Sequence, residues 1–257
     1  MPARQIESYV ICTTPRSGST LLCELLAATR VAGRPGSHFH APSLDEWLKD
    51  YGLDGERFAS RREALRAVLD AARVRGTGDT GMFGLRMQRG SFAHFMQQLD
   101  VLHPDRTSDV ARIEAAFGPT LFVHLSRLDR LGQAISRVRA EQTGLWHRRA
   151  DGTELERLAP PREPCYDAEA IARHMADLSA LDGAWEDWFA REGIEPLRIG
   201  YDALAADPQG VLADLLDVLG LGRAHAQGIE PPTAQLADAM SREWRARFEA
   251  KGGKRAT

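Results

Sequence analysis

A short apolar run that passes through a small polar turn into an amphipathic segment constrains this chain most. The run begins at Tyr9 and reads Tyr-Val-Ile-Cys-Thr-Thr, the turn reads Pro-Arg-Ser-Gly-Ser-Thr, and the next segment begins Leu-Leu-Cys. β-Branched residues in the run are typical of a buried strand, and an amphipathic segment is typical of a helix. The sequence therefore predicts a strand, a tight loop and a helix, a unit of open α/β sheets.

Three further apolar runs occur between longer segments with helical periodicity. The predicted strands are residues 8–13, 82–87, 121–126 and 196–199, although the second could also be one turn of a core helix. The clearest helix is predicted over residues 167–192, where apolar side chains recur every three or four positions before a terminal glycine. This alternation predicts a three-layer α/β sandwich with a mainly parallel sheet.

The predicted domain covers residues 1–250, and residues 251–257 are expected to form a disordered tail. Residues 144–166 contain prolines at three points and no clear periodicity, so we expect a long irregular connection there. Connections of this length are usually functional or mobile.

Charge and cysteine content exclude several classes of function. The 33 basic and 36 acidic residues nearly cancel, which favours neither a nucleic-acid partner nor an anionic membrane, so any anion site must be local. Three cysteines without a CxxC pair indicate neither a disulfide framework nor a metal site. No segment reaches the roughly 20 apolar residues of a membrane span, and no secretory signal is apparent. We therefore expect a cytoplasmic protein.

The loop after the first strand has the features of a phosphate site. It lies where parallel strands end, and the following helix directs free N–H groups and a positive dipole end toward it. Its candidate ligands are Arg16, Ser17, Gly18, Ser19 and Thr20, in which the glycine permits close approach and the arginine supplies a planar fork of donors. The loop lacks the length and the lysine of a Walker A motif, which disfavours nucleotide triphosphate hydrolysis. The alternative is a plain turn with a capping serine.

A second anion site is predicted at the end of the third strand. Arg127 ends that strand, a helix begins near Asp129, and Ser136 lies on this helix. An arginine in such a place can instead be a surface salt-bridge partner. Taken together with the first loop, however, it predicts a ligand that is phosphorylated at two positions.

These patterns resemble the bacterial carbohydrate branch of the sulfotransferases that use 3′-phosphoadenosine 5′-phosphosulfate (PAPS), typified by trehalose 2-sulfotransferase and nodulation-factor sulfotransferases. The resemblance extends from about Tyr9 to Phe248. It rests on Arg16-Ser-Gly-Ser-Thr-Leu-Leu22, Ala32-Gly33 with Pro35, the run from Arg127 to Ser136, Gln142-Thr-Gly-x-Trp146, and Glu243-Trp244.

The resemblance implies transfer of a sulfuryl group from PAPS to a hydroxyl of a carbohydrate or related small-molecule acceptor, without a metal. It assigns the 5′-phosphosulfate to the first loop and the 3′-phosphate to Arg127 and Ser136. Arg16 would also stabilise the charge that develops on the leaving oxygen. Members of this branch can be homodimers, although no interface can be identified from this sequence.

The predicted base departs from the family pattern. The family reads approximately Gly-Glu-Pro-x-Glu-Phe-Phe, with the second glutamate as base, whereas this chain reads Gly33-Arg-Pro-Gly-Ser-His-Phe-His40. Arg34 and Ser37 thus replace the two glutamates, and a serine cannot accept a proton unaided at neutral pH. We expect His40, or else His38, to act as the base, since imidazole suits that role. Both could instead be ordinary loop histidines, and an acceptor with an acidic hydroxyl would need little help from a base.

The acceptor is expected over residues 34–47, with Arg34, Ser37 and Trp47 as its contacts, beneath the connection after Gly144. The positive charge of Arg34 suggests an anionic acceptor. Two other functions remain open at this point. One is a small-molecule P-loop kinase, because phosphoryl transfer uses the same positioning logic. The other is a catalytically inactive module that binds PAPS.

Overall fold

Four parallel strands form the centre of the chain, whose computed structural model describes residues 5–149, 151–231 and 238–252. The strands lie in the order β2-β1-β3-β6, and each neighbouring pair is parallel. Their bounds are β1 (Ser8–Thr13), β2 (Phe83–Gln88), β3 (Thr120–Ser126) and β6 (Leu197–Gly200). The predicted α/β class with a parallel sheet is therefore confirmed, and the second apolar run is a strand.

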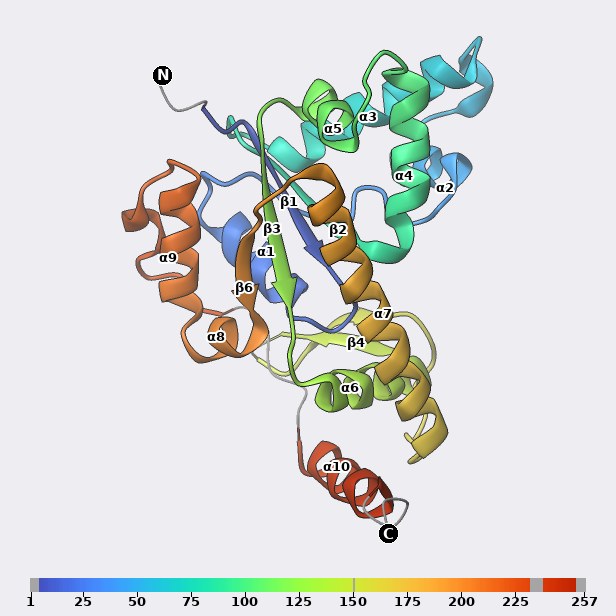
Figure 1. Ribbon diagram of the computed structural model, residues 1–257, viewed down its shortest axis with the longest axis vertical. Coiled ribbons are helices and arrows are strands. Elements are labelled where there is room, and N and C mark those ends of the chain that lie inside the picture. The colour runs from blue at the N-terminus through green and yellow to red at the C-terminus, as the bar shows by residue number, and fades with distance from the viewer. Residues whose placement is uncertain (1–4, 150, 232–237, 253–257) are drawn as a thin grey trace.

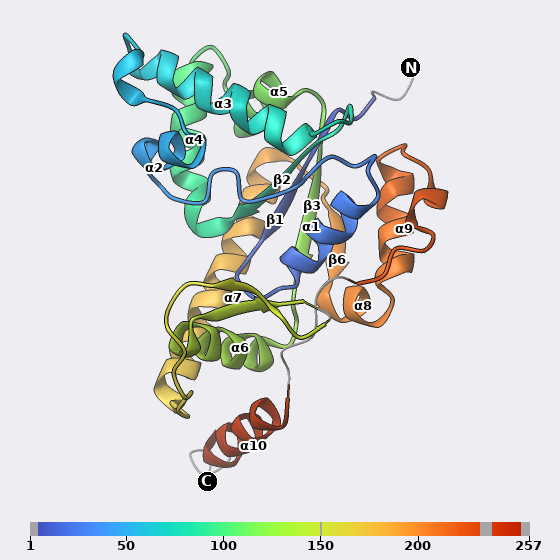
Figure 2. The same cartoon turned by 180° about the vertical axis from the view of Figure 1, so that it is seen from behind.

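Side chains of β1 alternate between two separate cores, because successive residues of a strand point to opposite faces. Val10 and Cys12 contact one core, whereas Tyr9 and Ile11 contact the other. The first core is covered by α2 (Leu44–Asp50), α3 (Arg61–Thr77), α4 (Arg89–Leu102), α5 (Asp109–Phe117) and α7 (Ala168–Glu192). The second is covered by α1 (Ser19–Ala28), α8 (Tyr201–Ala206) and α9 (Pro208–Val218). Figures 1 and 2 show these two layers on either side of the sheet.

Polar side chains cap the starts of α7 and α2. Asp167 accepts a hydrogen bond from the N–H of Ala170 at the start of α7, and Gly193 ends that helix in the left-handed conformation. Ser43 Oγ likewise accepts from the N–H of Glu46 at the start of α2. Two short 3₁₀ helices, η1 (Gly55–Arg57) and η2 (Arg223–Ala226), complete the connections.

The segment 144–166 is not wholly irregular, because it contains a β-hairpin. Strand β4 (Leu145–Arg148) pairs with the antiparallel β5 (Glu154–Arg157), with irregular register around His147. Each strand is only four residues long, and β5 carries three charged side chains, so neither strand produces the apolar alternation that predicts a strand. Figure 1 shows the hairpin near the ends of β1 and β3, above α6 (Arg130–Thr143).

Helix α10 (Ala239–Gly252) packs on α6 and α7 through a third apolar cluster that includes Trp244, Val138 and Ile171. It lies at the opposite end of the molecule from α5 (Figure 1). The predicted tail lies outside the described residues from position 253 onward. Within the described part of the chain, no helix has both the length and the apolar character needed to cross a membrane.

Candidate functional site

A cavity of about 960 Å³ opens at the carboxyl ends of the strands. It is lined by the loop between β1 and α1, the end of β2, helix α6, the β4–β5 hairpin and the start of α10. Among the described residues that line it are ten arginines but only three carboxylates. The chain as a whole has a net charge of −3, so the excess of cations around this cavity is local. Such a cavity has the size of a small-molecule site and the charge to attract an anion.

The loop between β1 and α1 has a tight, left-handed backbone. Arg16 has φ 63° and Gly18 has φ 87°, and the first value is uncommon for a residue other than glycine. Ser19, Thr20 and Leu21 form the first turn of α1 and line the cavity. Their N–H groups lie too early in the helix to have intrahelical acceptors, so this turn can receive an anion.

Ser17 does not present its hydroxyl to the cavity. Its Oγ donates to the carbonyl of Thr14 at 2.8 Å and bonds the hydroxyl of Thr13, and the residue is fully buried. The side chain therefore shapes the loop from inside, which leaves only the backbone of Ser17 for the predicted ligand contact.

Gln133 of α6 fixes the loop from the other side, a role that the sequence patterns did not indicate. Its Nε2 donates to Pro15 O at 2.7 Å and to Thr14 Oγ1 at 3.0 Å, while Arg130 donates to its Oε1. The side chain is completely buried. The only sequence signal was its place in the run from Arg127 to Ser136.

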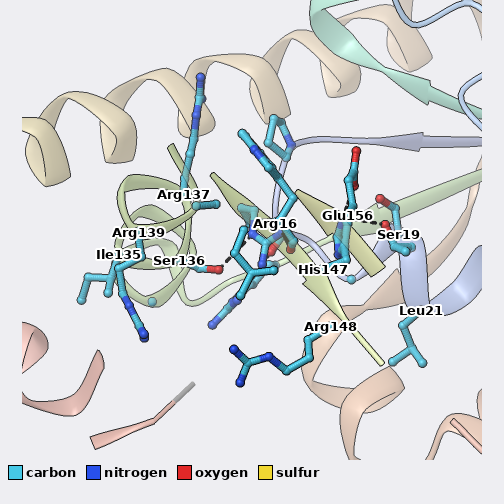
Figure 3. Close-up of a pocket in the computed structure, with 18 of the residues that line it drawn as sticks. Arg16, Ser19, Leu21, Ile135, Ser136, Arg137, Arg139, His147, Arg148 and Glu156 are labelled. Atoms are coloured by element: carbon cyan, nitrogen blue, oxygen red, sulfur yellow. Dashed lines mark hydrogen bonds and ion pairs between the residues drawn. The ribbon is translucent and has the colours of Figure 1, made fainter. Parts of the chain in front are cut away.

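Arg16 extends from this loop toward α6 and the hairpin. Its Nε donates to Ser136 Oγ at 3.0 Å and its Nη1 to the carbonyl of Trp146 at 2.6 Å (Figure 3). Burial, reinforced by the nearby Arg127, lowers the pKa of Arg16 to about 10, so the guanidinium still carries its charge at neutral pH. No carboxylate among the described residues forms an ion pair with it. A half-buried cation without a direct ion pair favours an anionic ligand.

Arg127 lines the same cavity, with its guanidinium 4.4 Å from the ring centre of Tyr201. Its Nη2 lies 3.5 Å from Asp129 Oδ2, but that carboxylate also accepts two closer bonds from Arg245, at 2.7 and 2.6 Å. Burial opposes ionisation of Asp129, but the bonds from Arg245 and from the N–H of Gly132 outweigh it and lower its pKa. Asp129 is thus shared between two arginines, which leaves Arg127 available to an anion.

Arg86 connects the loop to position 37. Its Nη1 donates to Thr20 Oγ1 and its Nε to Ser37 Oγ, each at 2.8 Å. The guanidinium therefore spans the first turn of α1 and the position where the family pattern has its second glutamate.

The hairpin adds His147 and Glu156 to this cluster. His147 Nε2 lies 2.9 Å from Thr20 Oγ1 and 3.3 Å from Glu156 Oε2. Figure 3 shows the side chains of His147 and Glu156 next to each other. Burial, followed by the charges of Arg16 and Arg86, lowers the pKa of His147 to about 3. The imidazole is therefore neutral at physiological pH.

Comparison with known proteins identifies the family. Residues 8–251 match the family described as Stf0 sulphotransferase. The chain belongs to that family.

Curated relatives of this sulfotransferase include two named trehalose 2-sulfotransferase. The protein of Mycobacterium tuberculosis (strain ATCC 35801 / TMC 107 / Erdman) is 31% identical, with 97% of each chain covered. That of Mycolicibacterium smegmatis is 29% identical, with 94% of each chain covered.

Similar solved structures include a sulfotransferase from Alicyclobacillus acidocaldarius, with TM-score 0.43, 15% identity, and coverage of 96% of this chain and 93% of that one. Another is the sulfotransferase domain of the Synechococcus PCC 7002 olefin synthase, with TM-score 0.41, 16% identity and coverage of 96% and 90%.

In this sulfotransferase the two predicted base histidines lie in different surroundings. His40 is exposed and lines the cavity together with Ser37. His38 is only 8% exposed, stacks on Phe83, and lies 3.3 Å from the carbonyl of Arg34. Burial lowers the pKa of His38 to about 4. Of the two, only His40 lines the cavity, whereas His38 packs against Phe83 of β2 outside it.

The predicted acceptor contacts Trp47 and Arg34 also lie away from the cavity. Trp47 is 1% exposed, donates to the carbonyl of Ala41 and packs against Phe39, because α2 turns its apolar face into the core. Arg34 is exposed, and its Nη2 lies 3.6 Å from Asp79 Oδ2. Of the predicted acceptor residues, the structure therefore brings only Ser37 to the cavity.

Proposed function

We propose that this sulfotransferase moves a sulfuryl group from PAPS to a hydroxyl of a carbohydrate or related small-molecule acceptor. The observation that carries this proposal is the opening of two arginine sites, one at Arg16 and one at Arg127, into one cavity of about 960 Å³. A donor phosphorylated at both ends of an adenosine would contact both sites at once.

In the proposed complex the 5′-phosphosulfate lies on the first turn of α1, where Arg16 and the N–H groups of Ser19 and Thr20 would bind it. The 3′-phosphate would lie on Arg127 and Ser136. In-line transfer builds negative charge on the oxygen between phosphorus and sulfur, so donors already fixed around that oxygen stabilise the transition state most.

Two observations support the acceptor class and the compartment. Both curated relatives are trehalose 2-sulfotransferases, which favours a sugar hydroxyl as acceptor. Cys12, Cys23 and Cys165 are all free thiols, which fits a reducing compartment such as the cytoplasm.

Thermal stabilisation tests the proposal. Adenosine 3′,5′-bisphosphate should raise the Tm of the protein more than 5′-AMP or ATP at equal concentration, because only the bisphosphate contacts both sites. Arg127→Gln should remove the preference for the bisphosphate over 5′-AMP. A larger, magnesium-dependent shift with ATP would instead support a kinase.

A transfer assay then distinguishes an enzyme from an inactive binding module. We expect PAPS and trehalose to give a product heavier by one sulfuryl group, detected by mass spectrometry. Binding of the bisphosphate without transfer to trehalose or to a panel of other sugars would support the inactive module.

A further inference from the structure

The acceptor hydroxyl needs a proton acceptor other than residue 37. Ser37 Oγ accepts a hydrogen bond from Arg86 and has no basic lone pair of useful strength. Five titratable proton acceptors line the cavity among the described residues: His40, His147, Asp129, Glu156 and Asp238. Asp129 is bonded by Arg245, and Asp238 is bonded by Arg139. The choice therefore lies among His40, His147 and Glu156.

We infer that His147, supported by Glu156, is the base that accepts the proton of the acceptor hydroxyl. This inference rests on the proposed function. His147 Nε2 is 2.9 Å from Thr20 Oγ1, in the turn of α1 where the phosphosulfate is placed. The same hydroxyl accepts a hydrogen bond from Arg86, whose guanidinium also donates to Ser37 Oγ. The ring of His40, by contrast, makes no hydrogen bond to any described residue of the loop.

Nε2 is the ring nitrogen of His147 that faces both Thr20 and Glu156. Thr20 Oγ1 accepts from Arg86 Nη1, so its own hydrogen is free to point to His147 Nε2. In the tautomer with the ring proton on Nδ1, the Nε2 lone pair accepts from Thr20. Glu156 Oε2, 3.3 Å from the same nitrogen, favours its protonation. When a phosphate oxygen takes the hydrogen bond of the Thr20 hydroxyl, the Nε2 lone pair becomes available to the acceptor.

The transfer step balances with this assignment. The acceptor oxygen forms its bond to sulfur while its O–H bond breaks, and the proton passes to Nε2 of His147. The bond between sulfur and the bridging oxygen breaks, and the 5′-phosphate leaves with that electron pair. The new imidazolium then lies 3.3 Å from Glu156 Oε2, which stabilises its positive charge.

Donor binding strengthens this base. In the free protein, the pKa of His147 is held at about 3 by burial and by the charges of Arg16 on the loop and Arg86 on β2. Glu156 of β5 faces the same ring. Glu24 and Cys23 of α1 line a second, smaller pocket together with His147. The negative charges of the donor would neutralise the two arginines, so the pKa of His147 should rise only when the donor is in place. The base would then be strongest at the moment of transfer.

Substitution separates the role of His147 from donor binding. In His147→Gln we expect transfer from saturating PAPS to trehalose to fall by about 100-fold or more, the usual contribution of a general base. Affinity for adenosine 3′,5′-bisphosphate, measured by calorimetry, should stay within about tenfold. Glu156→Gln should give a smaller loss of kcat. His225→Gln, on the exposed η2, is the matched control and should leave both quantities unchanged.

Titration supplies a readout that does not depend on activity. With isotope-labelled histidine, NMR should show the pKa of His147 rising by more than about one unit when adenosine 3′,5′-bisphosphate is added. An unmoved pKa, unchanged transfer in His147→Gln, or loss of transfer in His40→Gln instead would each overturn the inference. Failure of the wild-type protein to bind the bisphosphate would count against the proposed function itself, which is a different result.

Discussion

Arg16 Nε donates a hydrogen bond to Ser136 Oγ at 3.0 Å, although the two residues are 120 positions apart in the chain. The bond joins the loop after β1 to helix α6, and thus the two predicted anion sites. A ligand that contacts both residues must compete with this bond or share it.

Ser136→Ala should therefore weaken binding of adenosine 3′,5′-bisphosphate by about tenfold, equal to one hydrogen bond of about 1.4 kcal/mol. Binding of 5′-AMP, which lacks the 3′-phosphate, should change less. Calorimetry with both ligands measures the difference. Ser179→Ala, at an exposed position of α7, is the matched control. Equal losses for both ligands would show that Ser136 acts on the loop rather than on the 3′-phosphate.

Gly18→Ala should destabilise the protein and reduce donor binding. A Cβ at this position would lie 2.7 Å from Tyr201 Cδ2, and φ of +87° is unfavourable for alanine. We expect a loss of about 1–3 kcal/mol in the free energy of unfolding, measured with urea.

Gly183→Ala is the control for that substitution. Gly183 lies at an exposed position inside α7, where an added Cβ would meet no atom outside the backbone of its own helix within 4 Å. Alanine should therefore stabilise the protein there by about 0.5–1 kcal/mol, because it favours a helix over glycine. If both variants lost stability equally, the close approach at Gly18 would not be the cause.

Gln133→Ala should loosen the loop between β1 and α1. The substitution leaves Pro15 O and Thr14 Oγ1 without their buried donor, at a cost of about 1–3 kcal/mol. Urea unfolding measures the stability, and the affinity for adenosine 3′,5′-bisphosphate measures whether the loop keeps its binding conformation. Gln97→Ala, at an exposed position of α4, should alter neither. Wild-type affinity in Gln133→Ala would mean that the loop keeps its conformation without the hydrogen bonds from Gln133.

His38 should make stability depend on pH. Burial lowers its pKa from 6.5 to about 4, so between these values the unfolded chain takes up a proton that the folded chain does not. Stability should therefore fall as the pH falls from 6.5 to 4, by about 3 kcal/mol from this group alone.

Urea unfolding at several pH values compares wild type with His38→Gln, whose pH dependence should be weaker by that amount. His147, whose pKa is also low, contributes to both proteins and cancels in the comparison. An identical pH dependence in the two proteins would contradict the assignment to His38.

Local patterns in the chain were enough to predict the four strands of the parallel sheet, the loop after β1 and the positions of Arg16 and Arg127 near strand ends. Apolar runs, capping residues and a glycine turn each report on their own segment, so no knowledge of distant contacts was needed. The glycine that ends α7 was predictable for the same reason.

Which side chains meet in the cavity depended instead on how the elements pack. Proximity to Ser37 in the sequence suggested His38 and Trp47 as site residues, but packing against Phe83 and Phe39 buries them. The hairpin that carries His147 had no apolar alternation, and its contact with Thr20 joins positions 127 residues apart. Local periodicity cannot report such contacts, because they arise when separate elements come together around the ends of the sheet.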